Sequence, residues 1–303
     1  MRGVGWIDTA HSLEKNGNRT KKGTLSIPLL HGILSRMRAN IAFVIEALAA
    51  LDHTPNRALG QNFCIDGARL SRCVDALRLA GEPIVEIGPG LGGLTELLLP
   101  KSNTVLAIEK DAAMARFLSE SMPDPRLTVQ TGDALRLDYS AVGEPFSVVG
   151  NLPYYITTSI AERVLLRLPR VFGCLVQKEA GDRFFAKPRA DAYGALSVVT
   201  QLYYEGEVLE SFPESCFYPA PNVQSSFLGF WKRADAPEEP IERIFALVRT
   251  CLLMRRKTLK NNLKGIPNGL DALSYIGVSP ETRGETLTPE QFLALYRALQ
   301  SET

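Results

Sequence analysis

The sequence is poor in the residues on which metal and disulfide chemistry depend. Its three histidines all lie before residue 54, so neither a histidine metal site nor a histidine general base is expected in the rest of the chain. Its five cysteines are odd in number and widely spaced, which matches no disulfide framework and no zinc pattern. Buried thiols in a reducing compartment are the simplest interpretation. We therefore expect no metal and a cytoplasmic location.

Long hydrophobic runs are also missing. The longest apolar stretch near the start, residues 41–51, contains Glu46 and is too short to cross a bilayer. We expect an amphipathic or docking helix there, no secretory signal and no membrane association. Residues 1–36 show little hydrophobic periodicity, so we expect a disordered extension, with Met37 as an alternative start of translation.

Charge of one sign does not dominate the chain, because the net charge is only +1, which argues neither for nor against a nucleic-acid partner. Its distribution says more, since no acid interrupts the cations between residues 249 and 264. Lys257, Lys260 and Lys264 recur there at helical spacing, as they would on a helix that follows a phosphate backbone. The alternative is a solvated helix face. The cations predicted to bind nucleic acid are Lys178, Arg183, Arg255, Arg256, Lys257, Lys260 and Lys264.

Apolar strands alternate with amphipathic helices from residue 66 to about residue 177, as a parallel, doubly wound sheet requires. Strands are predicted near residues 83–87, 104–108, 126–130, 146–150 and 171–177, with two more near residues 207–211 and 223–231. After an acidic, proline-containing linker at residues 234–240 the pattern is wholly helical, with runs at 241–254, 257–263 and 289–299. We predict an α/β Rossmann-like domain over residues 37–235 and a smaller all-helical domain over residues 236–303.

Three strand ends carry residues suited to a nucleoside. Residues 84–95 read as a buried strand, a glycine-rich turn that lets the backbone approach a ligand, and a helix. Glu109 ends the next apolar run, where a carboxylate can accept both hydroxyls of a ribose. Asp133 ends the third and can accept the amino group of an adenine moiety. All belong to the carboxyl edge, where open α/β sheets bind ligands.

The fourth strand ends in Asn151-Leu152-Pro153-Tyr154. The amino group of adenine is a poor nucleophile, because its lone pair is delocalised into the ring, so an enzyme must hold both hydrogens with acceptors. Asn151 supplies one acceptor, and the Leu152 and Pro153 carbonyls can supply the second, while Tyr154 offers a face for stacking. The alternative is an ordinary strand end with Tyr154 in the core.

The spacing Gly88-x-Gly90-x-x-Gly93 with Glu109 also fits the dinucleotide fingerprint of nicotinamide dehydrogenases. Hydride transfer, however, leaves Glu86, Pro89 and the asparagine motif unexplained. These features resemble the class I methyltransferases that use S-adenosylmethionine, in which the acidic residue of the first strand braces the glycine loop.

Further motifs occur in a fixed order along the chain. They are Leu59-Gly60-Gln61-Asn62-Phe63, the glycine loop, Glu109, Gly132-Asp133-Ala134, Asn151-Leu152-Pro153-Tyr154, Gln177-Lys178-Glu179, Tyr193-Gly194-x-Leu196-Ser197-Val198, Phe217-x-Pro219-x-Pro221-x-Val223-x-Ser225 and Arg255-Arg256-Lys257-Thr258-Leu259. From about residue 40 to residue 298, the set resembles the ribosomal RNA adenine dimethyltransferase family, in particular its bacterial small-subunit members.

This resemblance implies N6,N6-dimethylation of two adjacent adenines in the 3′-terminal hairpin of 16S ribosomal RNA in the immature small subunit, by a monomer with S-adenosylmethionine as cofactor. It implies an RNA-binding role for the helical domain. The implied cofactor contacts are Asn62, Cys64, Gly88, Gly90, Glu109, Asp133, Ala134 and Asn151. The implied catalytic residues are Asn151, Leu152, Pro153 and Tyr154, with Phe217 stacking on the other face of the target base.

Two positions depart from the family pattern. Cys64 stands where leucine is usual, and Ala180-Gly181 replaces valine-alanine, which could weaken a helix beside the RNA face. Three alternatives keep the chemistry but change the target or the emphasis. They are an erythromycin-resistance type 23S ribosomal RNA methyltransferase, a DNA adenine methyltransferase, and a ribosome-assembly factor for which methylation is secondary.

Overall fold

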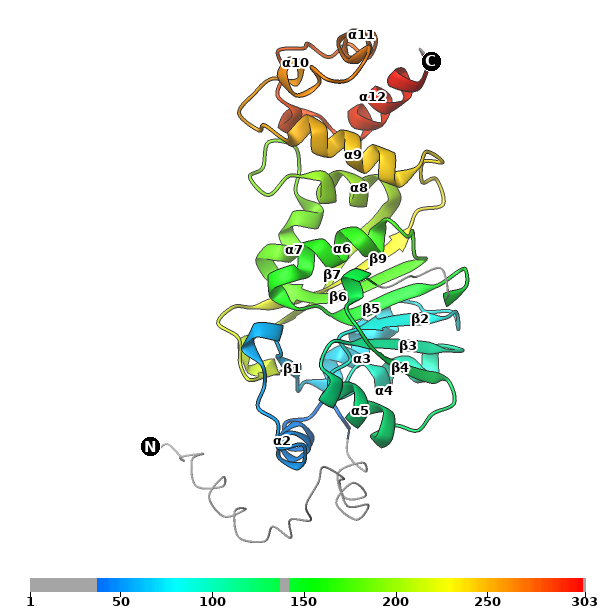
Figure 1. Cartoon of the computed structure of the whole chain (residues 1–303), viewed down its shortest axis with the longest axis vertical. Helices are drawn as coiled ribbons and strands as arrows, with labels where there is room; N and C mark the ends of the chain where they lie inside the picture. The colour runs from blue at the N-terminus through cyan, green and yellow to red at the C-terminus, as the bar shows by residue number, and fades with distance from the viewer. Residues whose placement is uncertain (1–36, 137–141, 302–303) are drawn as a thin grey trace.

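The computed structural model describes residues 37–136 and 142–301, which form a mostly parallel sheet with helices on both faces (Figure 1). The strand order is β4-β3-β2-β5-β6-β9-β7. The parallel strands are β2 (Ile84–Ile87), β3 (Val105–Glu109), β4 (Leu127–Thr131), β5 (Ser147–Asn151) and β6 (Val171–Gln177). β9 (Ser225–Lys232) is antiparallel to β6 and to β7 (Tyr204–Phe212). This confirms the predicted α/β class and the strands.

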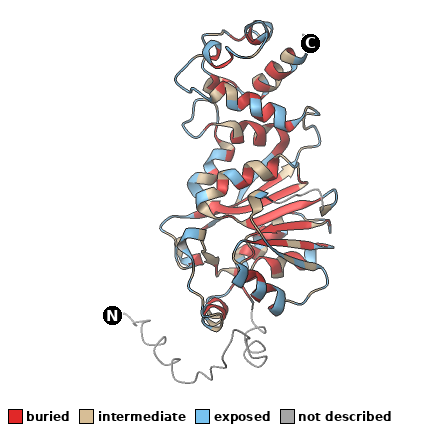
Figure 2. Cartoon of the chain, viewed as in Figure 1, coloured by how far each residue is buried: buried red, intermediate tan, exposed pale blue. Residues whose placement is uncertain are grey.

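Helices cover both faces of the sheet because its central strands are apolar on both sides, as Figure 2 shows. One face packs against α3 (Gly67–Ala76) and α4 (Thr95–Leu98), which continues into the 3-10 turn η2 (Leu99–Lys101). The other face packs against α6 (Thr157–Leu165), α7 (Lys178–Phe185) and α8 (Ala195–Tyr203). The carboxyl edge between these layers stays open to a ligand.

The predicted docking helix is α2 (Ile41–Ala50), which packs its buried Phe43 and Val44 against α5 (Ala112–Ser121). The guanidinium of Arg38 fixes its start, donating hydrogen bonds to the Leu91 carbonyl (2.9 Å) and the Ser121 carbonyl (2.6 Å). The segment is therefore part of the folded unit and supports the glycine loop from outside. The predicted extension at residues 1–36 lies outside the described residues.

The C-terminal helices α9 (Ile241–Leu252), α10 (Leu259–Asn262), α11 (Gly269–Tyr275) and α12 (Pro289–Ser301) stack beyond α8 in Figure 1. One continuous cluster of buried side chains joins them to the sheet face that carries α6 and α8. Among the described residues no helix is long and apolar enough to cross a membrane.

Some predicted boundaries were wrong. The helix predicted at residues 257–263 is only the four-residue α10, because the chain turns at residues 253–257 and Thr258 pairs with Arg283. Helical spacing of Lys257, Lys260 and Lys264 was therefore not a valid argument. The sequence analysis also missed α11 and the short pair β1 (Phe63–Cys64) and β8 (Phe217–Tyr218).

Candidate functional site

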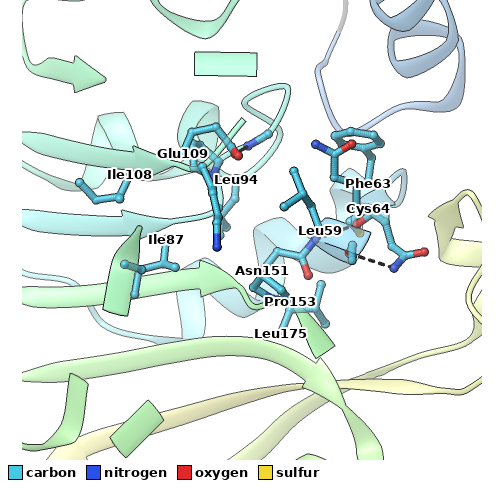
Figure 3. A pocket seen from close by; sticks show the side chains of 18 of the residues that line it. Leu59, Phe63, Cys64, Ile87, Leu94, Ile108, Glu109, Asn151, Pro153 and Leu175 are labelled. Carbon is cyan, nitrogen blue, oxygen red and sulfur yellow. Dashed lines mark hydrogen bonds between the residues drawn. The ribbon is translucent and has the colours of Figure 1, made fainter. Parts of the chain in front are cut away.

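A single pocket at the carboxyl edge collects most of the predicted site residues. It contains about 1080 Å³ of space, counting its open mouth, a size in keeping with small-molecule sites. Figure 3 shows Ile108 and Glu109 on one side, Phe63 and Cys64 on the other, and Asn151 between them. The predicted site residues that line it are Asn62, Cys64, Gly88, Gly90, Glu109, Asp133, Ala134, Asn151 and Pro153.

The glycine loop can take its shape only with glycine at two positions. Gly88 has a φ of +70° and Gly90 a φ of +54°, a region that side chains disfavour. A Cβ on Gly90 would lie 3.0 Å from the ring of Phe63, and one on Gly88 would lie 3.1 Å from the backbone oxygen of Asn151. The loop therefore leaves a cradle between β2 and β5 that a side chain would fill.

Glu109 is held rigidly at the end of β3. One carboxylate oxygen accepts the N–H of Gly90 (3.0 Å) and the other accepts the N–H of Asp111 (2.8 Å). Burial nevertheless raises the pKa of this carboxyl above its usual value. Each oxygen retains a further lone pair, so the group can still accept two hydroxyls of a sugar.

Asp133 and Ala134 form the next part of the wall. The Asp133 carboxylate accepts hydrogen bonds from the Leu135 N–H (3.0 Å) and from the Lys110 ammonium (3.1 Å), and its pKa is lowered mainly by the first of these. It is therefore an ionised acceptor for an amino group. Ala134 together with Ile87 and Ile108 gives an apolar surface for a flat ring. Ribose acceptors, an amine acceptor and an apolar slot fit the adenosine part of S-adenosylmethionine.

Asn151 is oriented by a neighbour that only accepts. Its Nδ2 donates to the backbone carbonyl of Asn62 at 2.9 Å. Because a carbonyl cannot donate, the amide must present its nitrogen there. Oδ1 is then left as the acceptor for an amine in the pocket, the role predicted from the sequence.

The rest of the asparagine motif is divided in its roles. The Pro153 carbonyl already accepts from the Thr157 hydroxyl (3.1 Å) and the Ile156 N–H (3.2 Å), so it is engaged within its own turn. The Leu152 carbonyl accepts none of the hydrogen bonds found among the described residues, which leaves it as the second acceptor for the amine, although the Leu152 side chain is buried.

Tyr154 and Phe217 do not line the pocket in this structure. The Tyr154 hydroxyl bonds to the Ser225 hydroxyl at 2.7 Å, and burial raises its pKa. Phe217 is 3% exposed and sits in the core, although it pairs with the pocket residue Cys64 between β8 and β1. Their predicted stacking on the target base stays a prediction.

Comparison with known proteins adds the decisive observation. A model of the family described as ribosomal RNA adenine dimethylase matches residues 52–301. The chain is 41% identical over 264 residues to the ribosomal RNA small subunit methyltransferase A of Bacillus thuringiensis (strain Al Hakam), covering 80% of this chain and 90% of the relative. The chain belongs to the ribosomal RNA adenine dimethylase family. The predicted family is thus confirmed.

Two solved structures show the same fold as this dimethylase. A dimethyladenosine transferase from Plasmodium falciparum superposes with a TM-score of 0.67 at 22% identity, covering 78% of this chain and 96% of that one. The 23S rRNA methyltransferase ErmE superposes with a TM-score of 0.57 at 28% identity, covering 77% and 97%. The Rossmann-like methyltransferase fold is therefore confirmed, and the dehydrogenase alternative is set aside.

The two departures from the family pattern are accommodated in the dimethylase core. Cys64 is buried against the pocket, and burial raises its pKa to about 12, so it acts as a small apolar residue. Gly181 forms part of α7 despite its low helix propensity. A Cβ there would lie 3.3 Å from Leu228 of β9, so glycine permits close packing of α7 on the sheet.

Sequence reasoning missed a polar brace behind the pocket of the dimethylase. The Gln61 amide donates to the Asp111 carboxylate (2.9 Å) and accepts from the Asn56 N–H (2.7 Å). His53 Nε2 lies 3.3 Å from the same Gln61 oxygen and 3.4 Å from Asp111. The brace ties the loop that carries Asn62 to the start of α5. Only the order of Gln61 before Asn62 could have pointed to it, since its partners are distant in sequence.

Glu86 is the most deeply buried carboxyl of the dimethylase. It is fully inaccessible on β2, and neither carboxylate oxygen has a hydrogen-bond partner. Burial raises its pKa to about 8, with Glu109 adding a smaller like-charge effect. A neutral Glu86 is the form that suits this position under the glycine loop.

The predicted RNA-binding cations of the dimethylase are not equivalent. Arg255 donates to the Ala190 and Asp191 carbonyls and pairs with Glu285 (3.3 Å), so it joins two loops. Lys178 pairs with Asp182 and Lys260 with Glu281, each at 3.5 Å, and Arg183 donates to the Thr158 hydroxyl. Arg256, Lys257 and Lys264 are exposed and have no ion pair among the described residues. These three remain the clearest candidates for phosphate contacts.

Proposed function

We propose that this chain transfers methyl groups from S-adenosylmethionine to the N6 atoms of two adjacent adenines in the 3′-terminal hairpin of 16S ribosomal RNA, during maturation of the small subunit in the cytoplasm. The named relatives at 40% and 41% identity are ribosomal RNA small subunit methyltransferases, which supports the choice of RNA. The observation that carries the chemistry is the fixed orientation of Asn151 beside the glycine cradle.

The pocket residues divide the work of binding. Glu109, Asp133 and Ala134 would hold the adenosine part of the cofactor, while Gly88 and Gly90 let the backbone approach it and Asn62 and Cys64 close the far wall. When bound, S-adenosylmethionine supplies a methyl group already activated on a sulfonium centre. The remaining task of the protein is to position the acceptor amine and to exclude water.

The target adenine must leave its stack before its amine can reach the pocket. Asn151 Oδ1 and the Leu152 carbonyl would then accept its two hydrogens, which turns the nitrogen lone pair toward the methyl group. No side chain is needed as a general base, because the amine becomes strongly acidic once methylated and can release its proton to water. Tyr154 and Phe217 would replace part of the lost stacking.

Binding of the small subunit is proposed for the helical region, residues 236–303, with the chain acting as a monomer. Exposed Arg256, Lys257 and Lys264 would contact phosphates there, and Lys178 and Arg183 would extend the contact across α7. Each of these cations is solvent-exposed, which suits contacts that steer and position RNA without reading its sequence.

The test is transfer of labelled methyl groups to small subunits that lack this modification, followed by nuclease digestion and identification of the nucleoside. Dimethyladenosine at two adjacent positions of the 3′-terminal hairpin is expected. Label in large-subunit RNA or in DNA instead would move the assignment to those substrates. Tight subunit binding with no label at all would favour an assembly factor.

A further inference from the structure

Tyr155 is an aromatic side chain that the proposed mechanism does not use, although it borders the pocket. It follows the asparagine motif in the 3-10 turn η5 (Tyr154–Ile156) and lines the same pocket as Asn151. Its side chain is 55% exposed, more than that of most large hydrophobic residues of the chain. It therefore stands at the rim of the pocket and not in its floor.

Its neighbour Tyr154 is held in a different way. The Tyr154 hydroxyl is bonded to Ser225 at the start of β9, and the residue is half-buried outside the pocket lining. No hydrogen bond of the Tyr155 hydroxyl is found among the described residues. Of the two consecutive tyrosines, Tyr155 is the one that presents its ring at the entrance.

The surroundings of Tyr155 leave room for a flat partner. A Cβ on Gly60 would lie 3.5 Å from the Cδ1 of Tyr155 and 3.5 Å from the Cβ of Pro153, so Gly60 is flanked closely by both side chains. Its φ of +66° also favours glycine. The ring thus contacts the backbone of the loop that precedes Asn62 on one side, while more than half of its surface faces solvent.

We propose that Tyr155 is a stacking platform for the nucleobase that flanks the target adenine in the RNA. This proposal rests on the proposed function. A base whose amine reaches Asn151 lies inside the pocket, so the next base of the strand must lie near the rim. An exposed aromatic ring is the usual surface for an unstacked base, whatever its identity. With two adjacent adenines as targets, each would occupy the platform while the other is methylated.

The experiment compares three variants on a synthetic RNA hairpin with two adjacent loop adenines. Tyr155→Ala is expected to raise the KM for RNA about 5- to 150-fold, the range that corresponds to loss of one base–aromatic stack. Tyr155→Phe keeps the ring and should resemble the wild type, and Tyr155→Leu keeps apolar volume without a ring and should behave like Tyr155→Ala. The affinity for S-adenosylmethionine should be unchanged in all three. Tyr275→Ala, at an 81% exposed tyrosine on α11, is the matched control.

A second measurement asks whether the effect depends on the flanking base. If the neighbouring nucleotide is replaced by an abasic site, wild type and Tyr155→Ala should bind the hairpin equally well. A difference that persists on the abasic hairpin, or a loss of cofactor affinity in Tyr155→Ala, would overturn the proposal and make Tyr155 a structural support of the Gly60 loop.

The two proposals fail in different ways. If the wild-type protein methylates neither the hairpin nor unmodified small subunits, the proposed function is wrong. If it methylates them and Tyr155→Ala does so with the same KM, the function stands and the platform is wrong.

Discussion

The pocket at the carboxyl edge and the basic loop at residues 253–264 use polar groups in opposite ways. In the pocket, Glu109 and Asn151 are each fixed by backbone groups, yet keep acceptor capacity for a ligand. In the basic loop, Arg255 and Lys260 are engaged by carbonyls or acids of the protein itself. A residue at a strand end is committed by the sheet to one place, whereas a charge in a run is free to find a partner within the fold.

The largest effect is expected from Asn151→Ala, which tests the pocket half of this comparison. Without the carboxamide oxygen the acceptor amine is misplaced, so methyl transfer should fall at least about 100-fold. Measured by single-turnover transfer and by calorimetric titration with S-adenosylmethionine, activity should be lost while cofactor affinity falls only modestly. An equal loss of both would make Asn151 a cofactor or structural residue.

Glu86→Gln tests whether a buried carboxyl beneath the glycine loop is neutral. The folded pKa of about 8 is higher than the unfolded value near 4.5, so the folded state binds more protons between these values. The wild type should therefore lose up to about 1.4 kcal/mol of unfolding free energy per pH unit across this window as the pH rises. Urea denaturation at pH 5, 6.5 and 8 should show a smaller loss for the variant, and parallel curves would contradict the neutral form.

Gly90→Ala separates backbone strain from the cradle itself. Gly81 is the matched control, because it has a φ of +85° but nothing within 4 Å of a Cβ, whereas a Cβ on Gly90 meets Phe63. Both alanine variants should lose about 1–2 kcal/mol of stability from the positive φ. Only Gly90→Ala should also weaken S-adenosylmethionine binding, by about tenfold or more. Equal cofactor affinity in the two variants would remove the cradle from the argument.

The smallest effects concern the basic loop. Arg256→Gln and Lys257→Gln should each reduce the slope of log K against log salt for RNA binding by about 0.7–0.9, with little change in stability. Arg255→Gln should instead lower the melting temperature, because it releases the two carbonyls and Glu285. Filter binding at several salt concentrations and thermal denaturation distinguish the two kinds of arginine. The same salt slope in all variants would mean that the loop is merely solvated.

The sequence analysis predicted the sheet well because each buried strand is an unbroken apolar run bounded by turn residues. It placed Glu109, Asp133 and Asn151 at one edge for the same reason, and all three line the pocket. It was less successful at residues 257–264, where the spacing of the lysines suited a helix but the chain turns. It also chose Tyr154 as the aromatic face of the pocket without considering its neighbour Tyr155.

The sequence by itself determined the class of fold, the order of strand ends and the family, because apolar periodicity and motif spacing are local properties of the chain. Only the tertiary structure decided which polar atoms remain available. The Asn62 carbonyl orients Asn151 from 89 positions away in sequence, and Ser225 engages Tyr154 from 71 positions away. Such pairings arise when distant segments meet at the edge of the sheet, and no local pattern encodes them.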